Sequence, residues 1–356
     1  MDTRTIDHLE IYVEDAEKAA DELAGLFGFS VAGQGGPETG LTDRRSVLLR
    51  QHDITLVVTA ALTPAHRAGE YVRRHGAGVA VVGLAVDDAA AAFTEAVRLG
   101  AEPAAAPVVL DRDGDRVTFA SVRGFGDVEH CLVSRNRANG LFAPGQIEET
   151  GEPASTTGLL QTIDHLAVCV PAGTLTDTIR WYQQVFGWEQ TFKERIVVGS
   201  QAMDSKVVQS SSRGVTLTII EPDTTRAPGQ IDAFVRDNAG PGVQHVAFLT
   251  GDIAASVRDC TGRGVRFLGT PAEYYAALPE RLGDVGVPVT TLRNLNILAD
   301  RDYDGVMLQI FTESRHDRRT LFYELIERRG ARTFGSNNIK ALYEAIERRR
   351  EADRAS

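Results

Sequence analysis

Three side chains in the second half of the chain have the types and spacing of a metal site. His165, His245 and Glu324 are separated by 80 and 79 residues, and apolar residues flank each of them. A histidine in such a segment is commonly only a hydrogen-bonded core residue, but a carboxylate there is costly unless it is paired or bound to a cation. Two imidazoles and one carboxylate are the ligands of many non-haem Fe(II) centres, which keep positions open for substrate and oxygen. The set therefore predicts iron-dependent oxygen chemistry.

Other chemistries are less well supported by the sequence. Zn(II) also accepts two histidines and one glutamate, but the chain has no HExxH helix and no evident base glutamate for hydrolysis. It has no GxSxG motif, and Cys169 and Cys260 have no obvious histidine partner. The glycine-rich stretch 33–40 lacks both the GxGxxG and the GK[ST] patterns of phosphate-binding loops. These observations disfavour hydrolysis, nucleophilic catalysis and nucleotide binding.

An internal repeat divides the chain into two related halves. Residues 5–13 (TIDHLEIYV) match residues 162–170 (TIDHLAVCV), and residues 76–88 match residues 240–252 in the same order. His8 thus corresponds to His165, whereas Val81 stands where the second half has His245, and the first half has no matching glutamate. Because a metal needs the full ligand set, we expect the first half to be a scaffold without a metal.

The repeat also predicts the elements that position the three candidate ligands. Each half shows strand, helix, strand, strand modules, with helices expected at 16–26, 89–99, 175–185 and 253–262. Ser-Arg-Gly separates two strand-like stretches before Pro222, as in a hairpin. The pattern predicts an α+β fold with curled mixed sheets and a covering C-terminal helix at 339–350. Residues 135–161 read as a linker, so the expected domains are 1–150 and 151–356.

Composition excludes several other classes of protein. The 356 residues include 38 Lys and Arg against 49 Asp and Glu, a formal net charge of −11, which disfavours binding to nucleic acid or to an anionic membrane. No apolar run has the length of a membrane-spanning helix, and the charged N-terminus does not resemble a signal peptide. The three cysteines are too scattered for a disulfide framework and are expected to be buried thiols. A soluble cytoplasmic protein is the expectation, with a homodimer left open.

The longer motifs resemble those of the 4-hydroxyphenylpyruvate dioxygenase family, which has the vicinal-oxygen-chelate fold. The similar segments include IDHLAVCV, GVQHVAF, YYAALPERLG, MLQIFTES and LFYELIERRG, and they are densest from residue 160 to residue 348. The resemblance implies two vicinal-oxygen-chelate domains, Fe(II) on the three candidate ligands, and 4-hydroxyphenylpyruvate and O₂ as substrates. It implies further pocket residues, namely Gln309 near the 2-oxo acid and Gln230, Gln244, Phe334 and Asn338 around the substrate.

The family carries out two reactions, and several residues bear on which one applies. One reaction hydroxylates the ring to give homogentisate, and the other hydroxylates the benzylic carbon to give 4-hydroxymandelate. Ile220 stands where the ring-hydroxylating members have an asparagine, and Ile339 stands where they have a phenylalanine. The segment around Ser205 also resembles the benzylic hydroxylases, and Ser205 and Thr218 are candidate contacts of the phenol. We therefore expect 4-hydroxymandelate, with homogentisate as the alternative.

Some interpretations stay open at this point. Ile220 and Ile339 could be plain core residues, because apolar side chains line pockets and cores alike. Tyr323 stands where the family is expected to have phenylalanine, and as a strand neighbour of Glu324 it should point away from the ligand face. One alternative is a metal-free binder of aromatic molecules, which the complete ligand set disfavours. Another is a Zn or Mn lyase of the same superfamily, which Val81 disfavours because such enzymes usually take ligands from both halves. The benzylic reaction would fit supply of hydroxyphenylglycine for a peptide antibiotic, an expectation that rests on the resemblance alone.

Overall fold

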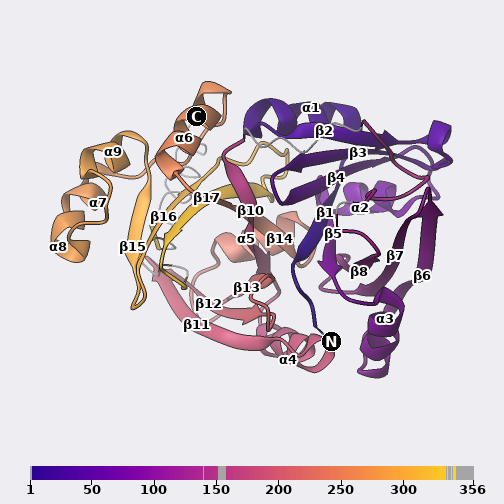
Figure 1. Cartoon of the computed structure of the whole chain (residues 1–356). Helices are drawn as coiled ribbons and strands as arrows, with labels where there is room; N and C mark the ends of the chain where they lie inside the picture. Colours follow the sequence, from indigo (N-terminus) through magenta and orange to yellow (C-terminus); the bar gives the residue numbers. More distant parts are fainter. Residues whose placement is uncertain are drawn as a thin grey trace.

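The fold is described from a computed structural model that covers residues 2–138, 140–150 and 158–333 together with Gly335, Asn338, Lys340 and Ala341. Each half of the chain builds one curled sheet with helices on both of its sides, and the two sheets lie next to each other (Figure 1). The sequence-based prediction of an α+β fold with two curled mixed sheets is confirmed. The part of the predicted covering helix beyond Ala341, and Ile339 within it, lie outside the described residues.

The first half forms a nine-stranded sheet with the strand order β6-β7-β8-β5-β1-β4-β3-β2-β9. β1 runs parallel to β4 and β5 parallel to β8, and the other neighbours are antiparallel. In chain order the elements are β1 (Ile6–Tyr12), α1 (Ala16–Phe27), β2 (Ser30–Gly35), a 3₁₀ turn (Pro37–Thr39), β3 (Arg44–Gln51), β4 (Ile54–Ala61), α2 (Arg67–His75), β5 (Gly78–Ala85), α3 (Ala89–Arg98), β6 (Pro103–Arg112), β7 (Asp115–Arg123), β8 (Glu129–Arg135) and β9 (Glu148–Glu149).

The second half forms an eight-stranded sheet with the order β11-β12-β13-β10-β14-β17-β16-β15. β10 runs parallel to β13 and β14 parallel to β17, which repeats the pairing of the first sheet. The elements are β10 (Leu160–Cys169), α4 (Leu175–Phe186), β11 (Glu189–Val198), β12 (Gln201–Gln209), β13 (Thr216–Pro222), α5 (Gln230–Asp237), β14 (Gly242–Thr250), α6 (Ile253–Gly262), α7 (Ala272–Ala276), α8 (Leu278–Leu282), α9 (Val289–Asn294), β15 (Leu298–Arg301), β16 (Val306–Phe311) and β17 (Phe322–Arg329).

Local sequence explains where the main helices begin and end. The Asp15 side chain caps α1 by accepting from the Lys18 amide, and Gly28 ends the helix with a φ of +76°. In the second half, Gly187 ends α4 in the same left-handed conformation, with a φ of +69°. The helices predicted at 16–26, 89–99, 175–185 and 253–262 are confirmed, as is the hairpin of β12 and β13.

The core has one large cluster and several smaller ones. The large cluster joins the outer faces of both sheets, where Phe27 and Phe29 of the first half contact Phe248 of the second, with ring centroids 6.4 and 5.9 Å apart. Inside the curl of each sheet, one helix packs on the inner face. α2 contributes Ala68 and Tyr71 to the first such cluster, and α5 contributes Ile231 and Phe234 to the second. The inner faces are therefore partly filled, and the remaining interior of the second sheet holds the polar site.

The expectation that residues 135–161 form a linker throughout is wrong in part. Within this segment β9 adds two residues to the edge of the first sheet, where Glu149 pairs with Gly33 in register and binds Arg50 through its side chain at 2.6 Å. Two residues are too few to show a strand period in the sequence. The proposed division at residue 150 leaves one sheet in each domain. None of the helices in the described part of the chain has the length and apolar character needed to cross a membrane.

Candidate metal centre

The three candidate ligands come from three adjacent strands at the centre of the second sheet. His165 of β10 pairs with Ala247 of β14, which pairs with Glu324 of β17, so these residues form one row across the sheet. In the neighbouring row, Ala167 pairs with His245, which pairs with Phe322. Because register partners project from the same face of a sheet, the two histidines and the glutamate meet inside the curl.

The ligand atoms lie close enough to share one ion. Nε2 of His165 is 3.4 Å from Oε2 of Glu324, and Nε2 of His245 is 3.3 Å from the same oxygen. One ligand atom from each residue falls within 4.8 Å of the others, and all three residues are buried. Phe322 and Phe311 pack around the His245 ring, with centroids 5.0 and 5.8 Å away. The cluster is thus a compact, apolar-walled set of two nitrogens and one carboxylate.

A carboxylate next to the first ligand fixes the orientation of its ring. Oδ1 of Asp164 lies 2.7 Å from Nδ1 of His165, and Arg328 donates to both oxygens of Asp164 at 2.7 and 2.8 Å. A carboxylate can only accept, so Nδ1 carries the proton and Nε2 presents its lone pair to the centre. The contact between consecutive residues depends on a β-bulge, since β10 has Asp164 as an extra residue between Ile163 and His165.

The charges of the cluster shift the pKa values of its members in opposite directions. Burial alone would lower the pKa of His165, but the charge of Glu324 and the hydrogen bond that His165 donates to Asp164 raise it to about 9. Burial likewise opposes ionisation of Glu324, yet the two histidines lower its pKa to about 2. Burial lowers the pKa of His245. Glu324 is therefore a buried anion that needs positive charge beside it, which a proton or a metal cation can supply.

The first half contains the same supporting residues and an equivalent of His165, but not the full set of ligands. Asp7 occupies an equivalent bulge, lies 2.8 Å from Nδ1 of His8 and binds Arg135. By register, however, Val81 stands where the second half has His245, and Cys131 stands where it has Glu324. Among the described residues, only the second half offers a cluster of metal-ligand type. The role of the first half as a scaffold without a metal stays a prediction.

Gln309 contacts the carboxylate ligand directly. Its Nε2 donates to Oε1 of Glu324 at 2.8 Å, which leaves Oε2 facing the two histidines. Asn338 in turn donates through Nδ2 to Oε1 of Gln309 at 2.8 Å. Both residues are buried. The structure therefore brings Gln309 and Asn338 to the metal centre, in contact with each other.

Three more of the pocket residues predicted from the sequence, Ser205, Thr218 and Ile220, lie on the same face of the sheet as the candidate ligands. Thr218 pairs in register with Ala167, which lies in the row of His245, and Ile220 pairs with Ser205 and with Cys169. Oγ1 of Thr218 and Oε1 of Gln244 are buried without a hydrogen-bond partner in the described structure. Buried polar atoms of this kind usually have a partner, so they mark a place for substrate or water.

Two further predicted residues, Gln244 and Gln230, are also buried. Gln244 is the extra residue of a second bulge, between His245 and Val243, so it departs from strict alternation. Gln230 is the buried first residue of α5, whose Ile231 and Phe234 pack against Ile220 and its neighbours. Phe334 and Ile339 lie outside the described residues.

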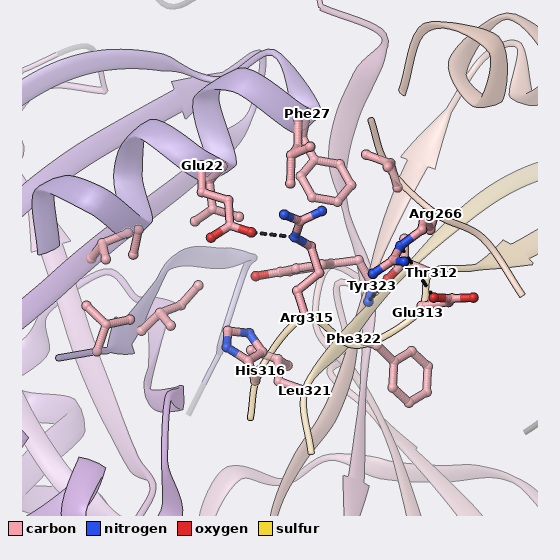
Figure 2. A pocket seen from close by; sticks show the side chains of 17 residues that line it. Glu22, Phe27, Arg266, Thr312, Glu313, Arg315, His316, Leu321, Phe322 and Tyr323 are labelled. Atoms are coloured by element: carbon pink, nitrogen blue, oxygen red, sulfur yellow. Dashed lines mark hydrogen bonds and ion pairs between the residues drawn. The ribbon is translucent and has the colours of Figure 1, made fainter. Parts of the chain in front are cut away.

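A separate pocket lies between the two halves, behind the strand that carries Glu324 (Figure 2). An ion pair between Glu22 of α1 and Arg315 of the β16–β17 loop spans it, and Tyr323 extends beneath Arg315 while the Phe322 ring turns away. Tyr323 stacks on Phe248, with centroids 5.6 Å apart. The expectation that Tyr323 points away from the ligand face is confirmed, and this pocket does not include the three candidate ligands.

Sequence reasoning missed Asp164, Arg328 and Tyr274, whose hydroxyl contacts Asn338 at 2.8 Å. A signal for Asp164 was present, because the dipeptide Asp-His recurs in both copies of the repeat. Arg328 and Tyr274 gave no such signal, since each acts through contacts with residues distant in the sequence.

Comparison with known proteins relates both halves to one superfamily. The model of the Glyoxalase/Bleomycin resistance protein/Dioxygenase superfamily matches residues 7–119 and, a second time, residues 164–279. The chain is 34% identical over 358 residues to the 4-hydroxyphenylpyruvate dioxygenase of Danio rerio, covering 97% of this chain and 90% of that protein. It is 32% identical over 358 residues to that of Dictyostelium discoideum, with 97% and 98% covered. A solved structure of a triple mutant of 4-hydroxymandelate synthase from Streptomyces coelicolor superposes with a TM-score of 0.90 at 45% identity, covering 98% of this chain and 100% of that one.

Proposed function

Since the chain belongs to the 4-hydroxyphenylpyruvate dioxygenase family, we propose that it is a 4-hydroxymandelate synthase. It would convert 4-hydroxyphenylpyruvate and O₂ to 4-hydroxymandelate and CO₂. The observation that carries this choice is the 45% identity to a solved 4-hydroxymandelate synthase over essentially the whole chain, against 30–34% to curated 4-hydroxyphenylpyruvate dioxygenases. The family assignment makes the chain a dioxygenase, and the choice between the two products is the proposal.

Fe(II) is the metal that we propose for the His165, His245 and Glu324 cluster. The donor set suits it, because two neutral imidazole nitrogens and one carboxylate oxygen, all buried, bind iron and leave coordination positions open. The buried negative charge of Glu324 has no cationic Lys or Arg hydrogen-bonded to it among the contacts of the described residues, which leaves it free to balance a cation. When bound, iron would supply the activation of O₂ and the oxidising power for decarboxylation and hydroxylation.

The protein groups around the centre bind and orient the substrate. Thr218 Oγ1 and Gln244 Oε1 are two of the buried polar atoms that lack a hydrogen-bond partner in the described structure, and we assign them to hydrogen bonds with substrate or with water held beside it. Ser205 lies across from Ile220 on the neighbouring strand, where it can contact the phenol end. Phe311 and Phe322 cover the His245 ring and exclude water from that side of the ligands.

Ile220 is the residue to which we assign the choice of product. It lies on the inner face between Ser205 and Cys169 and packs in the cluster that α5 covers. An amide at this place could hydrogen-bond the ring hydroxyl or a ring-attack intermediate, and the isoleucine side chain cannot. The aromatic ring then settles by shape alone, and the atom closest to the oxidant reacts. Ile339 has the same proposed role.

The homogentisate-forming reaction is the second candidate. The curated relatives carry the name 4-hydroxyphenylpyruvate dioxygenase, and the metal ligands and substrate would be the same.

The predicted cytoplasmic location and homodimer stay predictions.

A product assay tests the proposal. Purified protein is loaded anaerobically with Fe(II), mixed with 4-hydroxyphenylpyruvate and O₂, and the products are separated by liquid chromatography and identified by mass. We expect 4-hydroxymandelate as the main product. Homogentisate as the main product would contradict the synthase assignment and leave the metal centre standing, whereas iron binding without any turnover would contradict the substrate.

A further inference from the structure

A chain of hydrogen bonds, buried at its Glu324 end and exposed at the other, leads from Glu324 to a guanidinium group outside the cluster. Its members are Glu324, Gln309, Asn338, Tyr274 and Arg281, and we call it the Arg281–Glu324 chain. Tyr274 lies in α7 and Arg281 in α8, the short helices beside β15 and β16 in Figure 1. Asn338 belongs to the segment that follows β17. The Arg281–Glu324 chain therefore joins three separate parts of the second half to one metal ligand.

The first link needs one particular orientation of an amide group. Gln309 Nε2 donates to Glu324 Oε1 at 2.8 Å. A glutamine side chain fits almost equally well after a half-turn of its amide, but its oxygen would then face the carboxylate and repel it. Something must hold Gln309 with its NH₂ group toward Glu324. That group is Asn338, whose Nδ2 donates to Gln309 Oε1 at 2.8 Å.

Asn338 faces the same ambiguity, and Tyr274 resolves it. Oδ1 of Asn338 accepts from the Tyr274 hydroxyl at 2.8 Å, so Nδ2 is left for Gln309. Asn338 is 0% exposed, so water cannot substitute for these partners. With both ends of its amide engaged by these two residues, Asn338 acts on Gln309 rather than on substrate.

Tyr274 is itself oriented by a group that can only donate. Arg281 donates to the Tyr274 oxygen at 3.2 Å and to the Ala299 carbonyl at 2.8 Å, and the Ala299 amide donates to the same tyrosine oxygen at 2.9 Å. The Tyr274 hydroxyl can also donate to the Ala299 carbonyl, at 2.8 Å, but that carbonyl accepts from Arg281 as well, whereas Oδ1 of Asn338 has no other donor among the contacts of the described residues. The single hydroxyl proton is therefore available to Asn338.

The two ends give the Arg281–Glu324 chain one direction. A guanidinium can only donate and a carboxylate can only accept, so every group between them donates toward Glu324. We propose that Tyr274 and Asn338 are positioning residues of the metal centre, which hold Glu324 with Oε2 toward the two histidines. Metal affinity then depends on the contact between Asn338 and Tyr274.

A second set of contacts ties the same segment to the first ligand. Arg328, which binds Asp164 behind His165, also donates to the carbonyls of Ala331 and Thr333 at 3.3 and 2.7 Å. Ala331 and Thr333 thus contact the support of His165, and Asn338 contacts the support of Glu324. This inference rests on the proposed function, because it takes the cluster to be a metal centre.

The experiment measures metal affinity, using Co(II) as the probe. The metal-free full-length chain is titrated anaerobically with Co(II), and binding is followed by the visible absorption of the bound ion. The informative variants are Asn338→Asp, Asn338→Ala and Tyr274→Phe, and the matched control is Tyr275→Phe, a buried neighbour outside the Arg281–Glu324 chain. Thermal unfolding of each variant is recorded in parallel.

The direction of the hydrogen bonds predicts an order of effects. Asn338→Asp preserves shape but can only accept, so Gln309 must turn its oxygen toward Glu324, and we expect Co(II) affinity to fall about 10–100-fold. Asn338→Ala leaves Gln309 free to keep its orientation, so it should lower Co(II) affinity less. Tyr274→Phe should lower Co(II) affinity as much as Asn338→Ala, or less, but more than the control. Tyr275→Phe should bind like the unmodified protein.

Two results would overturn the inference. One is an Asn338→Asp variant that binds Co(II) as well as the Asn338→Ala variant or better. The other is that both Asn338 variants unfold at lower temperatures while their Co(II) affinity and absorption match those of the unmodified protein. That is the behaviour of a merely structural contact. If the unmodified chain itself binds no Co(II) or Fe(II), the proposed function fails and the inference with it, and this outcome is distinct from the other two.

Discussion

Glu324 is the residue on which the proposed metal centre depends most. It is 1% exposed and faces both histidines. We expect Glu324→Gln to abolish Fe(II) binding and to lower turnover by at least about 100-fold, because the neutral amide removes the ligand charge and has one oxygen where the carboxylate offers one to Gln309 and one to the metal. Metal content after gel filtration checks this. The control is Cys131→Ala, at the equivalent register position of the first half, which should keep full metal content.

The repeat supplies a matched pair for testing the second carboxylate. Asp164→Asn places a donor against Arg328 and weakens the orientation of His165, so we expect metal affinity to fall about 10–100-fold. Asp7→Asn breaks the same contacts with His8 and Arg135 in the first half. It should lower stability in a similar way while metal affinity stays unchanged. Equal losses of affinity in both variants would show that the effect is only structural.

Ile220 tests the origin of product choice. Replacing it by asparagine restores a hydrogen-bonding group on the inner face, and we expect the ratio of homogentisate to 4-hydroxymandelate to rise about tenfold, which corresponds to about 1.4 kcal/mol between the two barriers. Ile220→Val keeps an apolar surface and should leave the ratio unchanged. The ratio is read from the same chromatographic separation. An unchanged ratio in the asparagine variant would move the assignment to other residues.

Among single residues, the sequence is most informative about the ligands and least about their supports. His165, His245 and Glu324 stand out because their residue types and near-equal spacing already indicate a ligand set in the linear sequence. Asp164 acts on His165 only because a bulge turns two consecutive residues toward each other. A bulge adds one residue to a strand without a composition of its own, so periodicity does not reveal it.

At the level of helices and strands, two glycines at helix ends should change the free energy of unfolding in opposite directions when each is replaced by alanine. Gly187 ends α4 with a φ of +69°, where a side chain is strained even though a Cβ would meet nothing within 4 Å. Gly187→Ala should lower the free energy of unfolding by about 1–2 kcal/mol. Gly262 lies in α6, also with nothing within 4 Å, and without a positive φ. Gly262→Ala should raise the free energy by up to about 1 kcal/mol.

Denaturant unfolding of the two glycine variants measures both changes. Because each substitution adds the same methyl group in open space, the difference in sign isolates backbone conformation as the cause. Destabilisation by both, to the same extent, would contradict the description of these two helix ends.

The elements predicted correctly are those with a long, clear pattern. α1 and α4 have an apolar face and a terminal glycine, and β12 and β13 have a turn signal between them. α7, α8 and α9 have five or six residues each, too few for a helical period to emerge. β9, with two residues, is defined only by its partner β2. These short elements matter, since α7 carries Tyr274.

Across the molecule as a whole, a buried histidine couples the joint between the two halves to pH. His130 of β8 lies 2.7 Å from the Tyr182 hydroxyl of α4 and is 0% exposed. Burial lowers its pKa to about 3, against about 6.5 in the unfolded chain. Between these values the unfolded state binds the proton and the folded state does not, so stability present above pH 6.5 is lost as the pH falls.

The slope of stability with pH gives the measurement. His130 should contribute up to about 1.4 kcal/mol of destabilisation per pH unit below about pH 6.5. His130→Gln removes this titration, so its free energy of unfolding should fall less steeply with decreasing pH than that of the unmodified chain. Parallel slopes for the two proteins would contradict the assignment.

The repeat in the sequence predicts the two halves but not how they meet. The contact of Phe27 and Phe29 with Phe248, and the ion pair of Glu22 with Arg315, join residues that lie far apart in the sequence. The apolar residues that form this contact look like ordinary core positions in a linear sequence. The pocket between the halves in Figure 2 follows from the same packing, and no local pattern in the sequence predicts it.

A crystal structure of the chain with Fe(II) and 4-hydroxyphenylpyruvate, prepared without oxygen and recorded at the iron absorption edge, would decide whether this cluster is the iron centre. We expect one strong anomalous peak bound by His165, His245 and Glu324, with the substrate on the side of Thr218 and Gln244. An iron peak elsewhere, or none at these three residues, would contradict the proposed centre.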